Sequence, residues 1–285
     1  MKIFVTGANG KLARALIPAL RKGNKLILTS RNAVETRQLF GNDFKIDEVD
    51  LERASLSALK RLVKDVDVIV HTAGLVDFNA SKDKLFAANA EVTRKLAETG
   101  KPIIYISSVS VYRTRGAYGE SKRLGESYIR KGGGNLILRL GMVYGGDFTE
   151  GFSSVIKLIN KGFVFTLGDG LNQIPLVYYK DAVKAVVFSV KNFKKLKGGV
   201  FDVVFQPEPT QKECINEVAG LLGVSKKRWN LNLTLAHSFA GFLGKKDYVR
   251  MLSENRVYAN TIKGFKFDYP LKKGLREFLP ILGFK

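Results

Sequence analysis

A tyrosine and a lysine four positions apart, Tyr118 and Lys122, are the residues of this sequence best suited to chemistry. Side chains at this spacing lie on one face of a helix, so we expect the ammonium group beside the phenol. A neighbouring positive charge favours the phenolate and lowers the pKa of the phenol. The pair therefore predicts a tuned acid–base that can exchange a proton with a substrate hydroxyl.

A glycine-rich turn near the start of the chain indicates where a nucleotide would bind. The apolar run 2–5 leads into Gly7, Asn9 and Gly10, and Lys11 and Leu12 then open a stretch with helical spacing. Glycines let the backbone approach a phosphate closely, and the amides of a helix N-terminus can hold a pyrophosphate. Together the two motifs predict proton exchange at Tyr118 coupled to hydride exchange with a nicotinamide.

The elements that position these residues follow from alternating apolar runs and amphipathic stretches, a pattern typical of an α/β fold. We expect strands at 3–5, 26–28, 44–49, 66–70, 103–106, 136–140 and 200–205. We expect helices at 11–21, 56–64, 84–98, 118–131 and 181–190. The fold class predicted is a Rossmann-type, doubly wound parallel sheet. Residues 1–150 would form the NAD(P)-binding domain and 151–285 mainly a smaller substrate-binding lobe, with 176–205 returning to the sheet.

Composition limits the location and the metal chemistry of the protein. The 285 residues are 45% hydrophobic, and the chain has neither an apolar run that could span a bilayer nor a recognisable signal peptide. Cys214 is the only cysteine, and His71 and His237 are the only histidines. We therefore predict a cytoplasmic protein without a metal site.

The charge is the one unusual feature of the composition. Lys and Arg total 47 against 26 acidic residues, which gives a net charge of +21. Such an excess attracts polyanions and phosphorylated ligands. Because the basic residues are spread along the chain in short clusters, we interpret them as solvated charges and do not expect nucleic acid as a partner.

Cofactor preference depends on the end of the second expected strand. That strand ends at Ser30-Arg31 without an acidic residue to hold a ribose 2′-hydroxyl, and Arg31 could instead pair with a 2′-phosphate. We predict NADP, with NAD as the alternative. After the strand 66–70, His71 is expected to be a packed, hydrogen-bonded residue. The small residues Thr72, Ala73 and Gly74 that follow it would leave room for the cofactor.

The chain resembles the extended short-chain dehydrogenase/reductases, the NAD(P)-dependent epimerase/dehydratase superfamily, over nearly all of its length. The similar stretches are residues 6–13, Asp50-Leu51, Asn89-Ala90-Glu91-Val92-Thr93, 105–112, Tyr118–Lys122, 139–145, 168–170 and 177–181. The resemblance implies that Tyr118 is the acid–base, Lys122 binds the ribose, Ser108 holds the substrate oxygen and Asn89 belongs to the active-site framework. It also implies that Asp50 and Leu51 border the adenine, that Gly141 and Val143 lie beside the nicotinamide, and that the protein is a homodimer.

Departures from the family pattern narrow the reaction. Ser108 is followed by Val109-Ser110 rather than an Asp-Glu pair, so we do not expect dehydration. Residues 171–176 lack the Arg that many nucleotide-sugar enzymes of the family use for the diphosphate. Only ten positions separate Ser108 from Tyr118, and Arg113 and Arg115 within them could bind an anionic substrate group or be solvated.

Three functions remain open. The first is an NADP-dependent carbonyl reductase or alcohol dehydrogenase, and the second is a nucleotide-sugar 4-epimerase with tightly bound NAD. The third, from another class, is a non-catalytic nucleic-acid-binding or assembly protein on the same fold. The apolar stretch 231–243 is interpreted as lobe core, with a membrane or partner surface as the alternative. The identity of the small-molecule substrate is not readable from the sequence.

Overall fold

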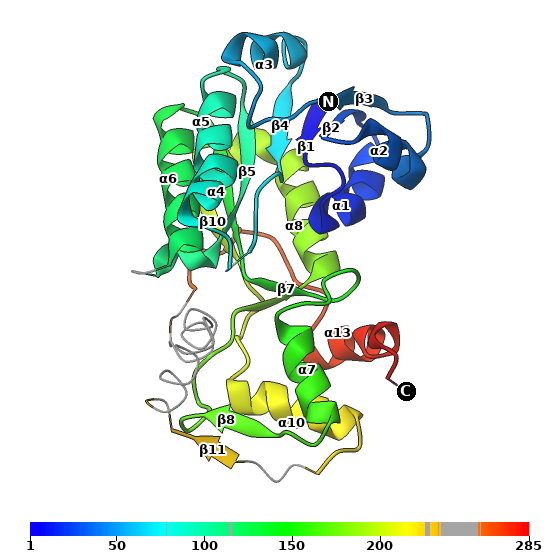
Figure 1. Ribbon diagram of the computed structural model, residues 1–285, viewed down its shortest axis with the longest axis vertical. Coiled ribbons are helices and arrows are strands. Elements are labelled where there is room, and N and C mark those ends of the chain that lie inside the picture. Colours follow the sequence, from blue (N-terminus) through cyan, green and yellow to red (C-terminus); the bar gives the residue numbers. More distant parts are fainter. Residues whose placement is uncertain are drawn as a thin grey trace. The chain divides into compact units, whose positions relative to one another are not determined.

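A computed structural model describes residues 1–77, 79–113, 116–225, 229–232, 234, 256 and 258–284. The chain forms two compact units. The first comprises Met1–Leu140 and Val183–Phe201, and the second comprises Gly141–Ala182 and Asp202–Lys285. Figure 1 shows the element order along the chain.

The first unit is built on a seven-stranded sheet whose strand order is β10-β6-β5-β4-β1-β2-β3. Its strands are β1 (Lys2–Thr6), β2 (Lys25–Ser30), β3 (Lys45–Glu48), β4 (Val68–His71), β5 (Ile103–Ser108), β6 (Leu136–Leu140) and β10 (Val200–Val203). The pairs from β3 across to β6 are all parallel. The predicted Rossmann-type sheet is therefore confirmed.

The strand order reverses at β1, which lies between β2 and β4. The chain leaves β1 towards β2 and β3 and returns at β4 on the other side. In an open parallel sheet, ligands bind at such a switch point, beyond the carboxyl ends of the strands. Thr6 at the end of β1 is in register with His71 at the end of β4, so the glycine turn and the segment after His71 meet at this edge.

Helices cover the sheet and the apolar strands form the core. The helical segments of this unit are α1 (Lys11–Arg21), α2 (Ala33–Phe40), α3 (Leu56–Leu62), α4 (Lys82–Phe86), the π turn η1 (Ala87–Glu91), α5 (Val92–Ala97), the 3₁₀ turn η2 (Val109–Tyr112), α6 (Ala117–Lys131) and α9 (Phe193–Leu196). Helices α4, α5 and α6 pack together, with α6 against β5 and β6, whereas α1 and α2 contact β2 (Figure 1). Phe4, Ile69 and Ile103 are fully buried in the core.

Several predicted elements differ in detail from the structure; the strand expected at 200–205 ends at Val203 and the helix expected at 56–64 ends at Leu62. The strand expected at 66–70 begins at Val68, because the amide of Val66 closes a turn onto the carbonyl of Val63 (3.1 Å). The single helix expected at 84–98 is interrupted by the π turn η1, which contains Asn89. Such single-turn bulges occur frequently at functional sites, and hydrophobic spacing does not reveal them.

Among its described residues, the second unit holds two small parallel strand pairs and three helices around its own core. Its elements are β7 (Met142–Tyr144), α7 (Phe152–Asn160), β8 (Phe165–Leu167), β9 (Leu176–Tyr178), α10 (Gln211–Leu221), β11 (Trp229–Leu231), α13 (Leu271–Phe278) and η3 (Pro280–Leu282). A capping box starts α10, in which Thr210 and Glu213 bond each other's main chain. Helix α8 (Tyr179–Lys191) runs from this unit into the first. Among the described residues, no helix is long and apolar enough to cross a membrane.

Candidate active site

The loop between β5 and α6 brings together Ser108 and Tyr118, the first two residues of the predicted catalytic set. Ser108 ends β5, the single turn η2 follows, and Tyr118 lies in the first turn of α6. The two side chains are hydrogen-bonded. The hydroxyl of Ser108 also accepts from the amide of Ser110 (3.1 Å), which fixes its position at the strand end.

The pKa of Tyr118 corrects one expectation. We predicted that Lys122 would lower this pKa, but burial raises it to about 12, with the hydrogen bond to Ser108 acting in the opposite direction. The physical reason is the burial of the phenol, and the Nζ of Lys122 donates to the main-chain carbonyl of Ile106 (2.7 Å). The phenol is therefore protonated at neutral pH, which is the form that can donate a proton to a carbonyl oxygen.

Lys122 is itself the most perturbed cation of the site. Its side chain is 5% exposed and lies over the ring of Tyr105, 4.4 Å from the centroid. Burial lowers the pKa of Lys122 to about 7, and the negative charge of Glu126 partly opposes that shift. A lysine in this state exists in both protonation forms at physiological pH.

Asn89 ties the segment after β4 to α6. Its amide oxygen accepts from the amide of Leu75 (2.8 Å), and its Nδ2 donates to the carbonyl of Leu75 (3.0 Å) and to Oγ of Ser121 (3.1 Å). The buried side chain of Asn89 thus bonds both to the segment after β4 and to α6. The structure brings Asn89 to the same region as Lys122, as the sequence predicted.

His71 is a structural residue, which confirms the interpretation from sequence. It is fully buried, its Nδ1 lies 2.8 Å from Oγ1 of Thr6 and its Nε2 lies 3.0 Å from Oγ1 of Thr93. Thr93 donates to the carbonyl of Asn89 (2.7 Å), so Nε2 carries the imidazole proton and Nδ1 accepts from Thr6. Burial, followed by the charge of Lys122, lowers the pKa of His71 to about 3. A neutral histidine with both nitrogens occupied is not available for proton transfer.

The glycine turn adjoins the segment after β4. Gly7 has φ +66°, and a Cβ there would lie 2.8 Å from the Cα of Ala73. Gly74 lies beside Asn89 and Lys122, since a Cβ there would lie 2.8 Å from Oδ1 of Asn89 and 3.7 Å from Nζ of Lys122. A continuous path of backbone therefore joins the predicted phosphate turn to Asn89 and Lys122, with Thr72 held by the carbonyl of Thr6 (2.5 Å).

The N-terminus of α1 has the features of a pyrophosphate site. Lys11 and Leu12 form its first turn, which contains no acidic residue, and among the described residues no side chain caps it at Gly10. Helix N-terminal amides together with the helix dipole favour an anion. The residues present therefore fit a dinucleotide at this turn.

A carboxylate that was not predicted from the sequence lies beyond the end of β2, in α2. Arg31 at the end of β2 is exposed, as expected for a side chain that would contact a 2′-phosphate. Nearby, Asn9 donates from Nδ2 to Oε2 of Glu35 (2.8 Å) and accepts from Oγ1 of Thr36 (2.7 Å). Glu35 in the first turn of α2 thus lies beside the glycine turn, four residues beyond the position where we looked for an acidic group.

The remaining predicted residues lie in several places. Asp50 begins a turn in which its Oδ1 accepts from the amide of Glu52 (3.0 Å), and Leu51 is buried in the core of the first unit. Gly141 and Val143 belong to the second unit, immediately before and within β7. Arg115 and most of the stretch 231–243 lie outside the described residues.

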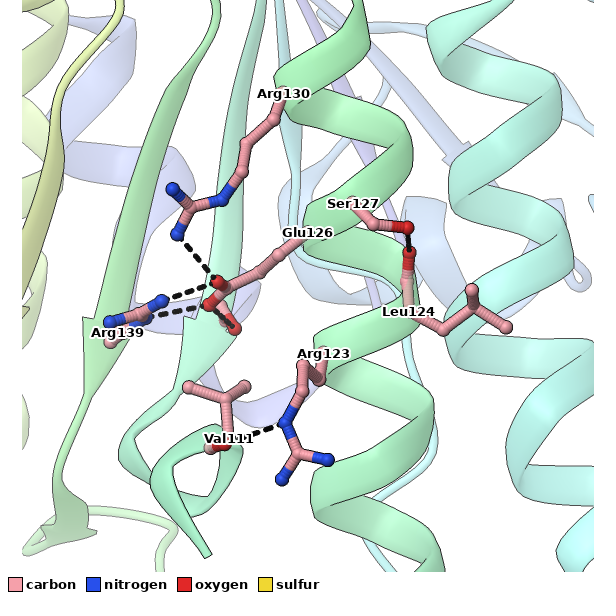
Figure 2. A network of polar contacts seen from close by, with 8 residues as sticks. Val111, Arg123, Leu124, Glu126, Ser127, Arg130 and Arg139 are labelled. Atoms are coloured by element: carbon pink, nitrogen blue, oxygen red, sulfur yellow. Dashed lines mark hydrogen bonds and ion pairs between the residues drawn. The ribbon is translucent and has the colours of Figure 1, made fainter. Parts of the chain in front are cut away.

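A buried charged network on α6 was not predicted at all. Glu126, 2% exposed, accepts two hydrogen bonds from Arg139 (2.8 and 2.6 Å) and one from Arg130 (3.3 Å), as Figure 2 shows. It also accepts one from Ser107 (2.7 Å). Burial raises the pKa of Glu126, but these hydrogen bonds and the charge of Arg139 outweigh it, so the net pKa is lowered. The signal in the sequence was the spacing: Glu126 follows Lys122 by four residues, as Lys122 follows Tyr118.

The fold and this site define a nucleotide-binding α/β protein with a Ser, Tyr, Lys and Asn cluster at the end of its sheet. Residues 3–203 match the model of the NAD dependent epimerase/dehydratase family. The chain belongs to this family, and the prediction of an NAD(P)-dependent oxidoreductase or epimerase is confirmed at that level.

Three known proteins illustrate the similarity. The chain is 28% identical to the ceramide reductase of Caulobacter vibrioides, over 65% of the chain and 59% of that protein. It is 26% identical to the UDP-2-acetamido-2,6-beta-L-arabino-hexul-4-ose reductase of Pseudomonas aeruginosa, over 77% of the chain and 56% of that protein. The chain therefore spans little more than half the length of either reductase.

A solved structure shares the fold. The UDP-glucuronic acid 4-epimerase of Bacillus cereus, solved with UDP-glucuronic acid and NAD, has a TM-score of 0.66 and 22% sequence identity, covering 88% of this chain and 100% of that one. This similarity confirms the fold class.

Proposed function

We propose that the protein is an NADP-dependent carbonyl reductase or alcohol dehydrogenase that works through Ser108, Tyr118 and Lys122. The observation that carries this proposal is the hydrogen bond between Ser108 and Tyr118, in a region where Tyr118 is kept protonated. The two similar reductases support reduction over epimerisation. The proposed substrate is a small molecule with a carbonyl or hydroxyl group.

In this proposal the chain's own residues bind, orient and protonate the substrate. The hydroxyl of Ser108 and the phenol of Tyr118 both donate to the substrate oxygen, and Tyr118 transfers its proton as negative charge develops there. Lys122, whose Nζ lies over the ring of Tyr105, would bind the ribose of the cofactor. Asn89 maintains the spacing between α6 and the segment after β4.

The nicotinamide dinucleotide, when bound, supplies or accepts the hydride. Gly7, Asn9, Gly10, Lys11 and Leu12 would hold its pyrophosphate, and Arg31 would pair with a 2′-phosphate. Thr72, Ala73 and Gly74 lie along the path from this turn to Lys122 and complete the cofactor side of the site. Asp50 and Leu51 near the adenine, and Gly141 and Val143 near the nicotinamide, are further proposals.

A nucleotide-sugar 4-epimerase with tightly bound NAD is the second candidate. The observations that favour it are the family match and the fold shared with an epimerase solved with NAD and a nucleotide sugar. Glu35 beside Asn9 also provides a carboxylate near the glycine turn, where a ribose hydroxyl rather than a 2′-phosphate could be held.

Thermal unfolding with NADPH, NADH or neither, at matched salt, tests the proposal. A cofactor at about a hundred times its Kd stabilises the folded state by roughly 2.7 kcal/mol. We expect NADPH to stabilise the wild type, and Arg31→Ala to lose about ten- to a hundredfold in NADPH affinity, because a charged hydrogen bond contributes about 1.5–3 kcal/mol.

Each outcome of this measurement leads to a different conclusion. Stabilisation by NADPH leads to a screen of carbonyl compounds by loss of reduced-nicotinamide absorbance. Stabilisation by NADH alone, or nucleotide retained through purification, favours the epimerase. No response in protein shown to be free of nucleotide contradicts both and leaves nucleic-acid or assembly binding, which a steep salt dependence would identify.

A further inference from the structure

We propose that Glu126 is a positioning residue of the candidate active site, which places a buried negative charge one helical turn from Lys122 and fixes the strand and helix that carry Ser108, Tyr118 and Lys122. The catalytic part of the role inferred for Glu126 rests on the proposed function. Its structural basis is independent of the reaction.

Glu126 lies on α6, the helix that also carries Tyr118 and Lys122. Tyr118, Lys122 and Glu126 follow one another at intervals of four residues, so their side chains lie along one face of the helix. Lys122 is 5% exposed and Glu126 is 2% exposed, so solvent screens the interaction between their charges only weakly. A carboxylate placed in this way stabilises the ammonium against the burial that disfavours it.

Glu126 is also bonded to the end of β5. Oγ of Ser107 donates to Oε1 of Glu126 (2.7 Å), and Ser107 immediately precedes Ser108. Arg139 on β6 binds both oxygens of Glu126 and lies over the ring of Tyr112, with its Cζ 4.5 Å from the centroid. Glu126 thus connects the end of β5, β6 and α6, and Figure 2 shows its bonds to Arg139 and Arg130.

Other charged and titratable groups surround Lys122 and Glu126. Facing Lys122 are His71 on β4 and Tyr105 on β5, and both are uncharged, because burial lowers the pKa of His71 and raises the pKa of Tyr105. Facing Glu126 are Arg139 and Arg130, which neutralise it without contacting Lys122 in the described structure. Glu126 is therefore the acidic group that acts on Lys122.

Titration of Lys122 in the nucleotide-free, full-length protein tests this inference without any substrate. Lysine side chains labelled with ¹³C and ¹⁵N are followed by NMR, and Lys122→Gln identifies the signal. We expect a midpoint near pH 7 in the wild type. In Glu126→Gln we expect it to fall by on the order of one pH unit, whereas Glu126→Asp keeps the charge and retains most of the wild-type midpoint.

Two further variants separate charge from structure. Glu126→Gln could unfold because it leaves Arg139 without its charged partner, so the double variant Glu126→Gln with Arg139→Gln removes both buried charges. We expect this double variant to regain thermal stability and still titrate at the lower pH. The matched control is Glu98→Gln, which neutralises an exposed carboxylate paired with Arg94 (2.6 Å) and leaves Lys122 unchanged.

The catalytic readout uses the pH profile of NADPH-dependent reduction of a carbonyl compound from the screen. The basic limb of kcat/KM is expected to move with Lys122, so that at pH 8 Glu126→Gln loses about tenfold for a shift of one unit. An unmoved titration midpoint in Glu126→Gln or in the double variant overturns the inference. Absence of turnover by the wild type instead contradicts the proposed function, while the NMR titration still decides the role of Glu126.

Discussion

Each unit contains a carboxylate that joins distant elements, but the two carboxylates differ in their access to water. Glu126 in the first unit is 2% exposed and accepts bonds from Arg139, Arg130 and Ser107. Glu277 on α13 of the second unit is 36% exposed and accepts from Nζ of Lys180 (2.6 Å) and from the phenol of Tyr178 (3.0 Å). The pKa of each carboxylate is lowered. Glu126 is shielded from solvent, however, whereas Glu277 is exposed to it.

In this fold the polar groups that indicate function are the buried, hydrogen-bonded ones. Burying a charge is unfavourable unless its partners compensate, and a buried network is retained where position matters. In the first unit His71, Asn89, Lys122 and Glu126 are all buried and hydrogen-bonded. The four predictions below test that contrast.

Tyr118→Phe is expected to have the largest effect. Loss of the acid–base should lower kcat for carbonyl reduction by about 10²–10⁴-fold with little change in stability. Steady-state kinetics and circular dichroism measure the two quantities. Tyr128→Phe on the same helix is the control and should retain activity. Equal losses in both variants would show that the phenol of Tyr118 has no specific role.

Arg139→Met should have the second largest effect, because it leaves Glu126 buried without its main partner. We expect a loss of about 3–5 kcal/mol in the free energy of unfolding, measured with urea. Arg130→Met, which removes the exposed partner of the same carboxylate, should lose about 0–1 kcal/mol. A loss below 1 kcal/mol for both variants would mean that burial does not strengthen this network.

The sequence predicted one side of this contrast well. Alternating apolar runs located the strands of the main sheet because parallel strands are buried on both faces. The Tyr118–Lys122 spacing predicted that both side chains lie on one face of α6, because it depends only on helix geometry. Asn89 was located by resemblance, but the π turn that presents it was not, since one extra residue in a helical turn leaves no mark in hydrophobic spacing.

The rest depended on tertiary partners. Glu35 and Asn9 meet through the return of α2 to the glycine turn, and Glu126 meets Arg139 across α6 and β6. The predicted direction of the Tyr118 pKa shift was wrong for the same reason: the burial of the phenol that raises its pKa follows from packing, which helical spacing does not contain. Most of the stretch 231–243 stays a prediction.

The pH dependence of stability gives a third, intermediate effect. The pKa of Lys122 is about 7 in the folded protein and near 10.5 when unfolded, so the unfolded chain holds the extra proton between these values. Stability from this group therefore rises with pH across that window, by up to about 1.4 kcal/mol per pH unit. Lys122→Met should remove that rise, measured by urea unfolding from pH 7 to 10. An unchanged slope would show that Lys122 titrates normally.

Glu277→Gln should have the smallest effect, because its ion pair with Lys180 is exposed on both sides. We expect a loss of about 0–1 kcal/mol at pH 7, decreasing further with added salt. Since the folded pKa of Glu277 is lowered, its contribution is present above its unfolded pKa and disappears as pH falls through the folded value. Urea unfolding at pH 7 and pH 3 measures this difference. A loss comparable to that of Arg139→Met would remove the contrast between the two carboxylates, and the phenol of Tyr178 would then be the partner to test next.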